Sequence, residues 1–343
     1  MISRLRLMLI VARPAVLVLL AVFTAIGLAQ AGRGSDPVLL GRALVVVVGF
    51  LMFSVACNDL ADVDIDRVNL PGDRRRPLVA GTAGRRDLVV LAVTGAVLAL
   101  AAAVTLHPAA VAVTLPGLIL SAAYSLRPLR LSGRGVVASL ALPACYVAVP
   151  YLVGVIAGRG TVRPGDLSLL AGLYVAFIGR ILLKDFRDVH GDALFGKRTF
   201  LVRYGRRRTC GFSACCWVAG TVTVLTAAPH PTPALYAGYA VCLAIALGLL
   251  RALAANPPMR QEEAIISATA IVGRGMMLAL LVHLTMMAAW GPLLIIHGTL
   301  LGLLFTLTVG QTVLMLVRGP MTRLTIPHSW TTTGRPHAPE LRR

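Results

Sequence analysis

The chain has 343 residues, of which 57% are hydrophobic and only 14% are charged, and its formal net charge is +19. A soluble domain usually has about 45–50% apolar and about 25% charged residues, so this composition favours an integral membrane protein over one or two soluble domains. The positive excess lies in short segments between apolar runs and forms no long basic tract with interleaved aromatic residues. We therefore expect the lipid bilayer as a partner and no nucleic acid.

Apolar runs long enough to cross a bilayer as helices, about 20 residues each, follow one another along the chain. Most of them begin and end at proline, glycine or charged residues, as helices do, and they are too long and unbroken for the strands of a membrane barrel. The first run follows Arg4 and Arg6 like a secretory signal, but because many spans follow it we interpret it as a retained first helix. The predicted spans are residues 12–30, 38–57, 87–106, 109–126, 136–157, 167–183, 209–228, 233–250, 264–289 and 292–317.

The distribution of lysine and arginine predicts the orientation of these spans. If the N-terminus is cytoplasmic and the spans alternate, the outside segments hold only Arg33, Arg159 and Arg163, and most of the 33 basic residues lie inside. This asymmetry follows the positive-inside rule. We therefore predict an all-α integral protein of the cell (cytoplasmic) membrane, with a single bundle of nine to ten transmembrane helices over residues 1–317. Residues 318–343 are polar and aperiodic, and we expect a disordered basic cytoplasmic tail there.

Two inside segments, 58–86 and 184–208, begin with the same arrangement of aspartates. In each motif three aspartates are spaced i, i+3, i+7, which on a helix places three carboxylates on one face. Carboxylates crowded together near a low-dielectric region repel one another, so the cluster needs neutralising cations. The two sets are Asp59, Asp62 and Asp66, and Asp185, Asp188 and Asp192.

The ligand types indicate which cation these segments would bind. Oxygen ligands without neighbouring histidine or cysteine suit a hard divalent ion, and Mg²⁺ fits best where phosphate oxygens complete its shell. Arg76 follows the first motif and Lys197 the second, and basic groups of this kind bind phosphate. A solvated charged loop would explain one such segment, but two copies at equivalent positions after a span predict a diphosphate–Mg²⁺ site.

At these positions the sequence resembles the UbiA-type membrane prenyltransferases, over residues 10 to about 290. The first motif matches that family's pattern N-D-x-x-D-x-x-x-D and the second matches D-x-x-D-x-x-x-D. The family usually has nine spans, whereas the apolar runs here number ten. The other matching elements are Arg13-Pro14, Arg76-Pro77-Leu78, Gly81, Tyr124-Ser125 and Gly196-Lys197-Arg198-Thr199.

The resemblance implies an enzyme, and the distribution of basic residues predicts that its active-site loops lie on the cytoplasmic side. It would ionise an isoprenyl diphosphate with Mg²⁺ and leave an allylic cation in a central cavity that excludes water. A small acceptor would then capture the prenyl group. The acceptor would be an aromatic compound, a quinol precursor, a sugar phosphate or a lipid alcohol. A membrane terpene cyclase of the same superfamily is the alternative, because it needs the same motifs. A transporter is disfavoured, since its ion site would lie near the bilayer midplane.

The expected roles of individual residues follow from the two motifs and from the resemblance. The ring of Tyr124 would either stabilise a cation or lie in the aromatic belt at the membrane interface, and we expect the catalytic contributions from Asp62, Asp188 and Tyr124. The expected Mg²⁺ ligands are Asp59, Asp62, Asp66, Asp185, Asp188 and Asp192. The expected diphosphate contacts are Arg76, Lys197, Arg130, Arg134, Lys184 and Asn58.

Ionisable residues inside spans are functional candidates by default. Arg180 either snorkels to the interface or orients the second motif. Arg274 is expected to pair within the bundle rather than bind substrate, and His283 to be a hydrogen-bonded interior histidine rather than a base. Asp64 lies off the shared face of the first motif and is left out of the metal site.

Overall fold

The computed structural model describes residues 7, 10, 11, 13–34, 36–69 and 76–288, and within these ranges the chain is helical without strands. The helices of the first half are α2 (Pro14–Gln30), α3 (Pro37–Ala61), α4 (Val63–Asn69), α5 (Arg85–Leu106), α6 (Pro108–Ser125), η1 (Leu131–Gly133), α7 (Val136–Pro143), η2 (Ala144–Ala148) and α8 (Val149–Arg159). Those of the second half are α9 (Pro164–Ile181), η3 (Leu182–Lys184), α10 (Asp185–Leu194), α11 (Phe200–Ala227), α12 (Pro233–Ala254) and α13 (Met259–Ala288).

The apolar helices confirm a multi-pass membrane protein. Eight helical segments of the described chain are long and apolar enough to cross a bilayer, and α2 is a shorter apolar helix. Two of the eight segments are composite, since α7, η2 and α8 run together, as do α9, η3 and the start of α10. The predicted tenth span, 292–317, and the tail, 318–343, lie outside the described residues, so the choice between nine and ten spans stays a prediction.

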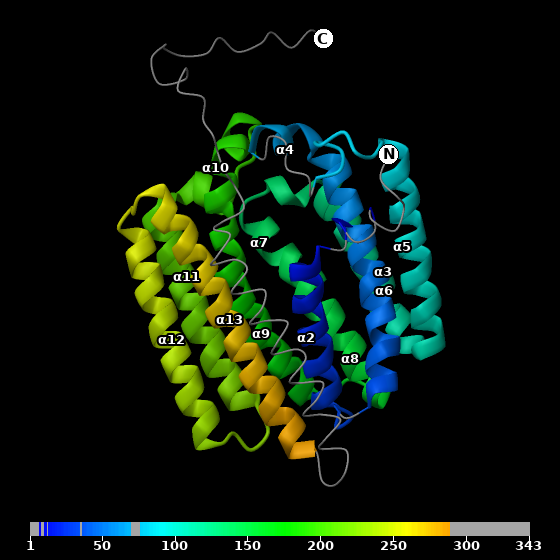
Figure 1. Ribbon diagram of the computed structural model, residues 1–343. Helices are drawn as coiled ribbons and strands as arrows, with labels where there is room; N and C mark the ends of the chain where they lie inside the picture. The colour runs from blue at the N-terminus through cyan, green and yellow to red at the C-terminus, as the bar shows by residue number, and fades with distance from the viewer. Residues whose placement is uncertain (1–6, 8–9, 12, 35, 70–75, 289–343) are drawn as a thin grey trace, which may run out of the picture.

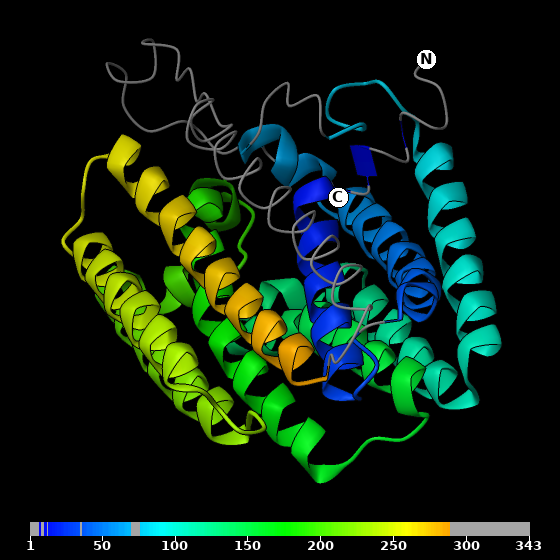
Figure 2. The same cartoon turned by 60° about the horizontal axis from the view of Figure 1, so that its bottom comes forward.

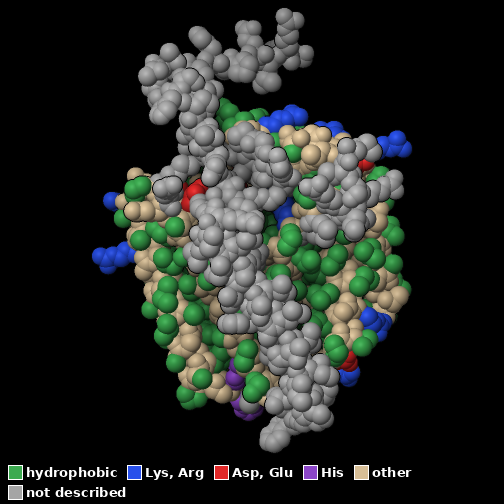
Figure 3. Space-filling model, in the orientation of Figure 1, with side chains coloured by type: hydrophobic (Ala, Val, Ile, Leu, Met, Phe, Trp, Pro, Cys, Tyr) green, Lys and Arg blue, Asp and Glu red, His purple; other side chains and the backbone are tan. Residues whose placement is uncertain are grey.

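The helices form one closed bundle. In Figures 1 and 2, α13 lies between α12 and α2, so the last described helix packs beside the first. The other main packings are α2 on α8, α3 on α5 and α9 on α11. Hydrophobic side chains cover the sides of the bundle in Figure 3, as a lipid-facing surface requires; Val93 and Val97 of α5, for example, are about 60% exposed (58% and 61%).

Small residues allow the helices around the interior to approach closely. A Cβ atom at Gly27 of α2 would lie 2.0 Å from the carbonyl oxygen of Tyr151 in α8. A Cβ atom at Gly154 of α8 would lie 2.1 Å from the carbonyl oxygen of Thr24. Both positions therefore require glycine, in the manner of membrane helix interfaces, and they fix α2 against the helix that follows η2.

Two regions that the sequence predicts as loops contain helices. The segment 58–86 includes α4, and the segment 184–208 includes α10 and the first turns of α11. Gly205 interrupts α11 with φ 77°, a conformation that favours glycine. These additional turns carry polar and basic residues, so hydropathy alone places the helix start too late, at 209 instead of Phe200. The two short helices α4 and α10 lie beside each other at one end of the bundle (Figure 1).

Candidate active site

The first aspartate motif lies across a break between two helices. Asp59 belongs to the last turn of α3, Asp62 is its C-cap with φ −105° and ψ 13°, and Asp66 lies in α4. The expected single helix face is therefore interrupted at Asp62. The helical hydrogen bonds persist on both sides of the break: the N–H of Asp62 donates to the carbonyl of Asn58, and the N–H of Asp66 donates to the carbonyl of Asp62. All three aspartates are buried, with exposures of 3%, 7% and 8%. The break turns α4 across the end of the bundle without exposing the carboxylates.

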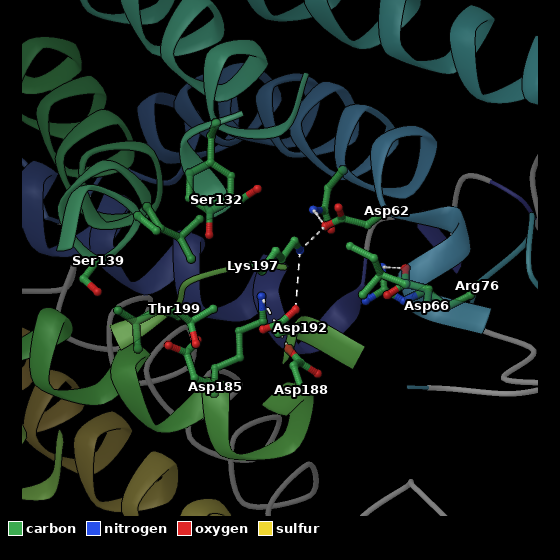
Figure 4. Close-up of a pocket in the computed structure, with 17 residues that line it drawn as sticks. Asp62, Asp66, Arg76, Ser132, Ser139, Asp185, Asp188, Asp192, Lys197 and Thr199 are labelled. Carbon is green, nitrogen blue, oxygen red and sulfur yellow. Dashed lines mark hydrogen bonds and ion pairs between the residues drawn. The ribbon is translucent and has the colours of Figure 1, made fainter. Parts of the chain in front are cut away.

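The second motif follows the predicted geometry. Asp185, Asp188 and Asp192 all lie on the short helix α10, directly after α9 and η3 leave the bundle. They line the same pocket as Asp62 and Asp66 of the first motif (Figure 4). The two motifs, more than a hundred residues apart in sequence, thus converge on one acidic pocket.

Basic side chains neutralise the first motif. Arg76 pairs with Asp59 and, at 3.1 Å, with Asp66. Arg13 lies 2.5 Å from Asp59. Arg130 lies 2.8 Å from Asp62.

Lys197 connects the two motifs. Its Nζ lies 3.1 Å from Asp62 and 3.7 Å from Asp192, and it occupies the centre of the pocket in Figure 4. Asn58 donates a further hydrogen bond to Asp62 at 3.1 Å, and Lys184 lies 3.9 Å from Asp188. Because a buried carboxylate is costly without a positive partner, these contacts explain how the acidic cluster is tolerated.

The environments of the carboxylates differ enough to separate their pKa values. Burial raises the pKa of Asp66 to about 6 despite the opposing effect of Arg76, and the nearby Asp59 acts in the same direction as burial. Burial also disfavours ionised Asp62, but Lys197 and Arg130 outweigh it and hold the pKa of that carboxyl below its ordinary value. An additional cation beside Asp66 would oppose the effect of burial and favour the ionised carboxylate.

The pocket has ligands that suit a hard metal ion, though they are not gathered around one point. Within the described residues, no three His, Cys, Asp or Glu side chains lie close enough together to hold a metal as they stand. The second oxygen of Asp59, Oδ2, is buried and has no hydrogen-bond partner among the described residues, so it has free capacity for a cation. The all-carboxylate ligand set fits Mg²⁺ in type, and a bound ion would compete with the basic residues for these oxygens.

Most of the other predicted site residues lie at the pocket. Asn58, Arg76, Tyr124, Lys184 and Lys197 line it directly, and Arg130 reaches it through its ion pair with Asp62. Arg134 is exposed after η1, and the structure does not bring it among the lining residues, so its contact with diphosphate stays a prediction.

Some lining residues were not anticipated from the sequence. Ser132, Ser139 and Thr199 add hydroxyl groups to the pocket (Figure 4). Thr199 belongs to the matching element that contains Lys197, although no role is predicted for it, and its Oγ1 also caps α11 by accepting from the N–H of Val202. Ser132 and Ser139 have no such signal. Arg13 was noted only as part of the resemblance, but its ion pair makes it a neighbour of the site.

The pocket continues into a deeper chamber. Asn58, Tyr124, Leu142, Ile181 and Lys184 line both spaces. The cavity volume is about 300 Å³ for the chamber and about 50 Å³ for the acidic pocket, and apolar side chains such as Leu19 and Phe177 form much of the chamber wall. An amphiphilic molecule with an anionic head in the pocket would therefore have room for an apolar chain.

Fold and site together define a membrane-embedded helical enzyme with a polar pocket at one end of the bundle and an apolar chamber behind it. Residues 19–271 match the model of the UbiA prenyltransferase family. The chain belongs to this family and is a prenyltransferase.

Named relatives and solved structures agree with this family. A digeranylgeranylglyceryl phosphate synthase from Methanoculleus marisnigri is 35% identical over 231 residues, which cover 66% of this chain and 78% of the relative. A chloroplastic chlorophyll synthase from Oryza sativa is 31% identical over 161 residues, which cover 45% of this chain and 42% of the relative. The solved UbiA homologue from Archaeoglobus fulgidus bound to DMAPP and Mg²⁺ superimposes with a TM-score of 0.60 at 16% identity, over 81% of this chain and 99% of the homologue.

Of the weaker predictions, the one for His283 is confirmed. Its Nε2 lies 2.9 Å from the carbonyl oxygen of Pro229, so it is a hydrogen-bonded interior histidine. Asp64 is exposed and pairs with Arg67 at 2.8 Å, away from the pocket as expected. The expected pairing of Arg274 is not seen: its Nε and Nη1 are buried without a hydrogen-bond partner in the described part of the chain.

Proposed function

We propose that this chain binds an isoprenyl diphosphate at the acidic pocket with Mg²⁺ and transfers the prenyl group to a small acceptor inside the membrane. The observation that carries the proposal is the convergence of both aspartate motifs on one pocket that opens into an apolar chamber. The A. fulgidus homologue bound to DMAPP and Mg²⁺ supports the assignment of donor and metal. The synthases among the relatives favour transfer over cyclisation.

Each group of residues has a distinct role in this proposal. When bound, Mg²⁺ supplies positive charge that neutralises the diphosphate. Arg76, Arg130 and Lys197 exchange their carboxylate partners for phosphate oxygens, which guanidinium and ammonium groups bind strongly. Tyr124 lines both the pocket and the chamber, where its ring would stabilise positive charge at the prenyl C1. The residues that would hold Mg²⁺ are Asp59, Asp62, Asp66, Asp185, Asp188 and Asp192.

The transfer is balanced without a further reactant. The C1–O bond of the donor breaks, and both electrons leave with the diphosphate. The nucleophilic atom of the acceptor supplies the electron pair for the new bond to C1 and gives up its proton to solvent. The apolar chamber keeps water from C1 until the acceptor reacts.

Product analysis of the purified chain tests this function. We expect prenylated acceptor and inorganic diphosphate in equal amounts when a prenyl diphosphate, Mg²⁺ and an acceptor are supplied, and neither when EDTA removes the metal. A panel of prenyl diphosphates with aromatic and glycerol-phosphate acceptors would identify the substrates. A cyclic hydrocarbon formed equally well without any acceptor would contradict transfer and indicate the cyclase.

We also propose that the acidic pocket faces the cytoplasm. The basic residues of the segments 58–86, 127–135 and 184–208 support this orientation through the positive-inside rule. Reporter fusions after residues 86, 134 and 208 should all report the cytoplasmic side. An outside signal from any one of them would contradict the span assignment.

A further inference from the structure

The chamber behind the acidic pocket has basic side chains set in its largely apolar wall. Its described lining includes five basic residues and no Asp or Glu. Three of the five have polar partners: Arg13 pairs with Asp59, Lys184 lies near Asp188, and Arg187 donates to Ser267 at 3.0 Å. The other two are Arg180 of α9 and Arg274 of α13.

These two arginines have buried nitrogen atoms that bond to nothing in the described chain. Nη1 of Arg180 and both Nε and Nη1 of Arg274 lack hydrogen-bond partners among the described residues, and Arg274 is only 5% exposed. The guanidinium of Arg180 lies 5.6 Å from the ring centre of Phe177, a contact that compensates only part of the lost hydration. An unsatisfied buried charged group is costly, more so inside a membrane, so an arginine pair of this kind indicates a function.

Helix packing brings the two guanidinium-bearing side chains to the same part of the chamber. A Cβ atom at Gly273 would lie 3.8 Å from Cδ of Arg180, so the stem of Arg180 passes against the residue next to Arg274. Two positive groups that line the same chamber repel each other in apolar surroundings. An anion between them would relieve the repulsion and satisfy the free N–H groups, and guanidinium groups are well shaped for phosphate or carboxylate.

We propose that Arg180 and Arg274 bind the anionic group of the acceptor, a phosphate or a carboxylate. The identification of the bound molecule as the acceptor rests on the proposed function. The existence of an anion site at Arg180 and Arg274 rests on the geometry alone. The donor diphosphate has its own place, since it needs the metal and therefore the carboxylates of the acidic pocket. The chamber has guanidinium groups and no described carboxylate in its lining, so it suits an anion that binds without metal.

An apolar groove next to the arginines gives the same molecule a place for a hydrophobic part. Phe177 and Arg180 line both the chamber and this groove. Leu173, Met276 and Met277 contribute further apolar wall, and Trp217 stands beside Gly273. The acceptor would therefore be amphiphilic or compact and aromatic, with its charge at the arginines and its nucleophile directed towards Tyr124.

Binding measurements on the purified full-length chain in detergent, without Mg²⁺ or prenyl diphosphate, test this site. Two matched pairs serve as probes: an alkylglycerol phosphate with the neutral alkylglycerol, and 4-hydroxybenzoate with its methyl ester. We expect the charged member of one pair to bind roughly 10- to 150-fold more tightly than its neutral counterpart. The pair that shows the difference identifies the anion as phosphate or carboxylate.

Variants assign the preference to the two arginines. Arg180→Gln and Arg274→Gln should each abolish the preference for the charged probe, while Arg208→Gln, at an exposed position of α11, should keep it. If a glutamine variant does not fold, Arg274→Lys serves in its place. Lysine keeps the positive charge but lacks the planar set of N–H donors of a guanidinium, so this variant should retain only part of the preference for the charged probe. Equal affinity for the charged and neutral members of both pairs, or no binding of either, would overturn the proposal, as would an unchanged preference in both glutamine variants.

Donor binding separates this inference from the proposed function. Mg²⁺-dependent binding of geranyl diphosphate should change less than about threefold in Arg180→Gln and Arg274→Gln. If the wild-type chain binds geranyl diphosphate with Mg²⁺ but shows no anion preference without it, the acceptor site is wrong and the proposed function stands. If it binds no prenyl diphosphate, the proposed function is wrong, and the charged and neutral probes still decide the anion site.

Discussion

The two aspartate motifs have the same spacing but different surroundings. The first, across α3 and α4, pairs with Arg13, Arg76, Arg130 and Lys197, and its ion-pair distances include 2.5, 2.8 and 3.1 Å. The second, on α10, has its described ion pairs at 3.7 and 3.9 Å. The side chain of Asp188 is 27% exposed, against 10% for Asp62. The first motif is thus held in place by basic residues, whereas in the second motif Asp188 is more exposed and Asp192, at 5%, is as buried as the first motif.

This difference indicates how the site would fill. Carboxylates in tight ion pairs must give up their partners before they can bind a metal, whereas more open carboxylates need less rearrangement. The displaced Arg76, Arg130 and Lys197 would then be available for phosphate oxygens. Substrate binding and the release of these ion pairs are therefore expected to be coupled.

The largest expected effect is loss of turnover when either motif loses its central aspartate. Asp62→Ala and Asp188→Ala should each lower kcat by at least about 100-fold, because each removes an oxygen ligand that the other motif cannot replace. Product release in saturating Mg²⁺ and prenyl diphosphate measures the effect. Asp64→Ala is the matched control: Asp64 is exposed and paired with Arg67, so activity should stay within about twofold. Full activity in either of the first two variants would show that the motifs do not act together.

A smaller effect separates the metal ligands from the diphosphate contacts. Lys197→Ala should lower kcat/KM by roughly 10- to 150-fold, because it removes a charge-assisted hydrogen bond, and added Mg²⁺ should not restore it. Asp66→Asn weakens a metal ligand, so raising Mg²⁺ should partly restore activity by mass action. The measurement is kcat/KM for prenyl diphosphate across a Mg²⁺ titration.

The neighbouring Arg198 provides the control for Lys197. It is exposed, and Arg198→Ala should change kcat/KM by less than about threefold. Rescue of Lys197→Ala by Mg²⁺, together with no rescue of Asp66→Asn, would reverse the roles assigned to these two residues.

Much of the fold and the acidic pocket could be predicted from the sequence, because the signals are local. Hydropathy marks the spans, and the spacing of the second motif predicts the face of α10. The break at Asp62 has no such signal: the residues around it include neither glycine nor proline. The sequence does not predict the first turns of α11, because they are rich in basic residues and are separated from the apolar part of the helix by the kink at Gly205.

The environment of Arg274 could not be predicted, because it depends on packing between distant helices. An arginine inside a span suggests a pairing partner, but only the fold places it beside Arg180 in a chamber whose described lining has no Asp or Glu. The contact of Arg13 with Asp59 has the same origin, since it needs the register of α2 against α3. Long-range side-chain neighbours were therefore the part of the site that sequence reasoning could not supply.

The smallest expected effect concerns stability and again distinguishes the motifs. Repulsion among carboxylates alone predicts that either alanine variant leaves the metal-free protein as stable as before, or slightly more so. The structure changes this expectation for Asp62, because Asp62→Ala removes the described ion-pair partner of Arg130 and leaves Lys197 with the longer 3.7 Å contact to Asp192. We expect a loss of about 1–3 kcal/mol, whereas Asp188→Ala, at a more exposed position, should cost less than about 1 kcal/mol. Apparent melting temperatures in detergent with EDTA measure the difference, and Asp62→Ala should melt lower than Asp188→Ala. Equal melting temperatures would show that the ion pairs of the first motif contribute no more to stability than those of the second.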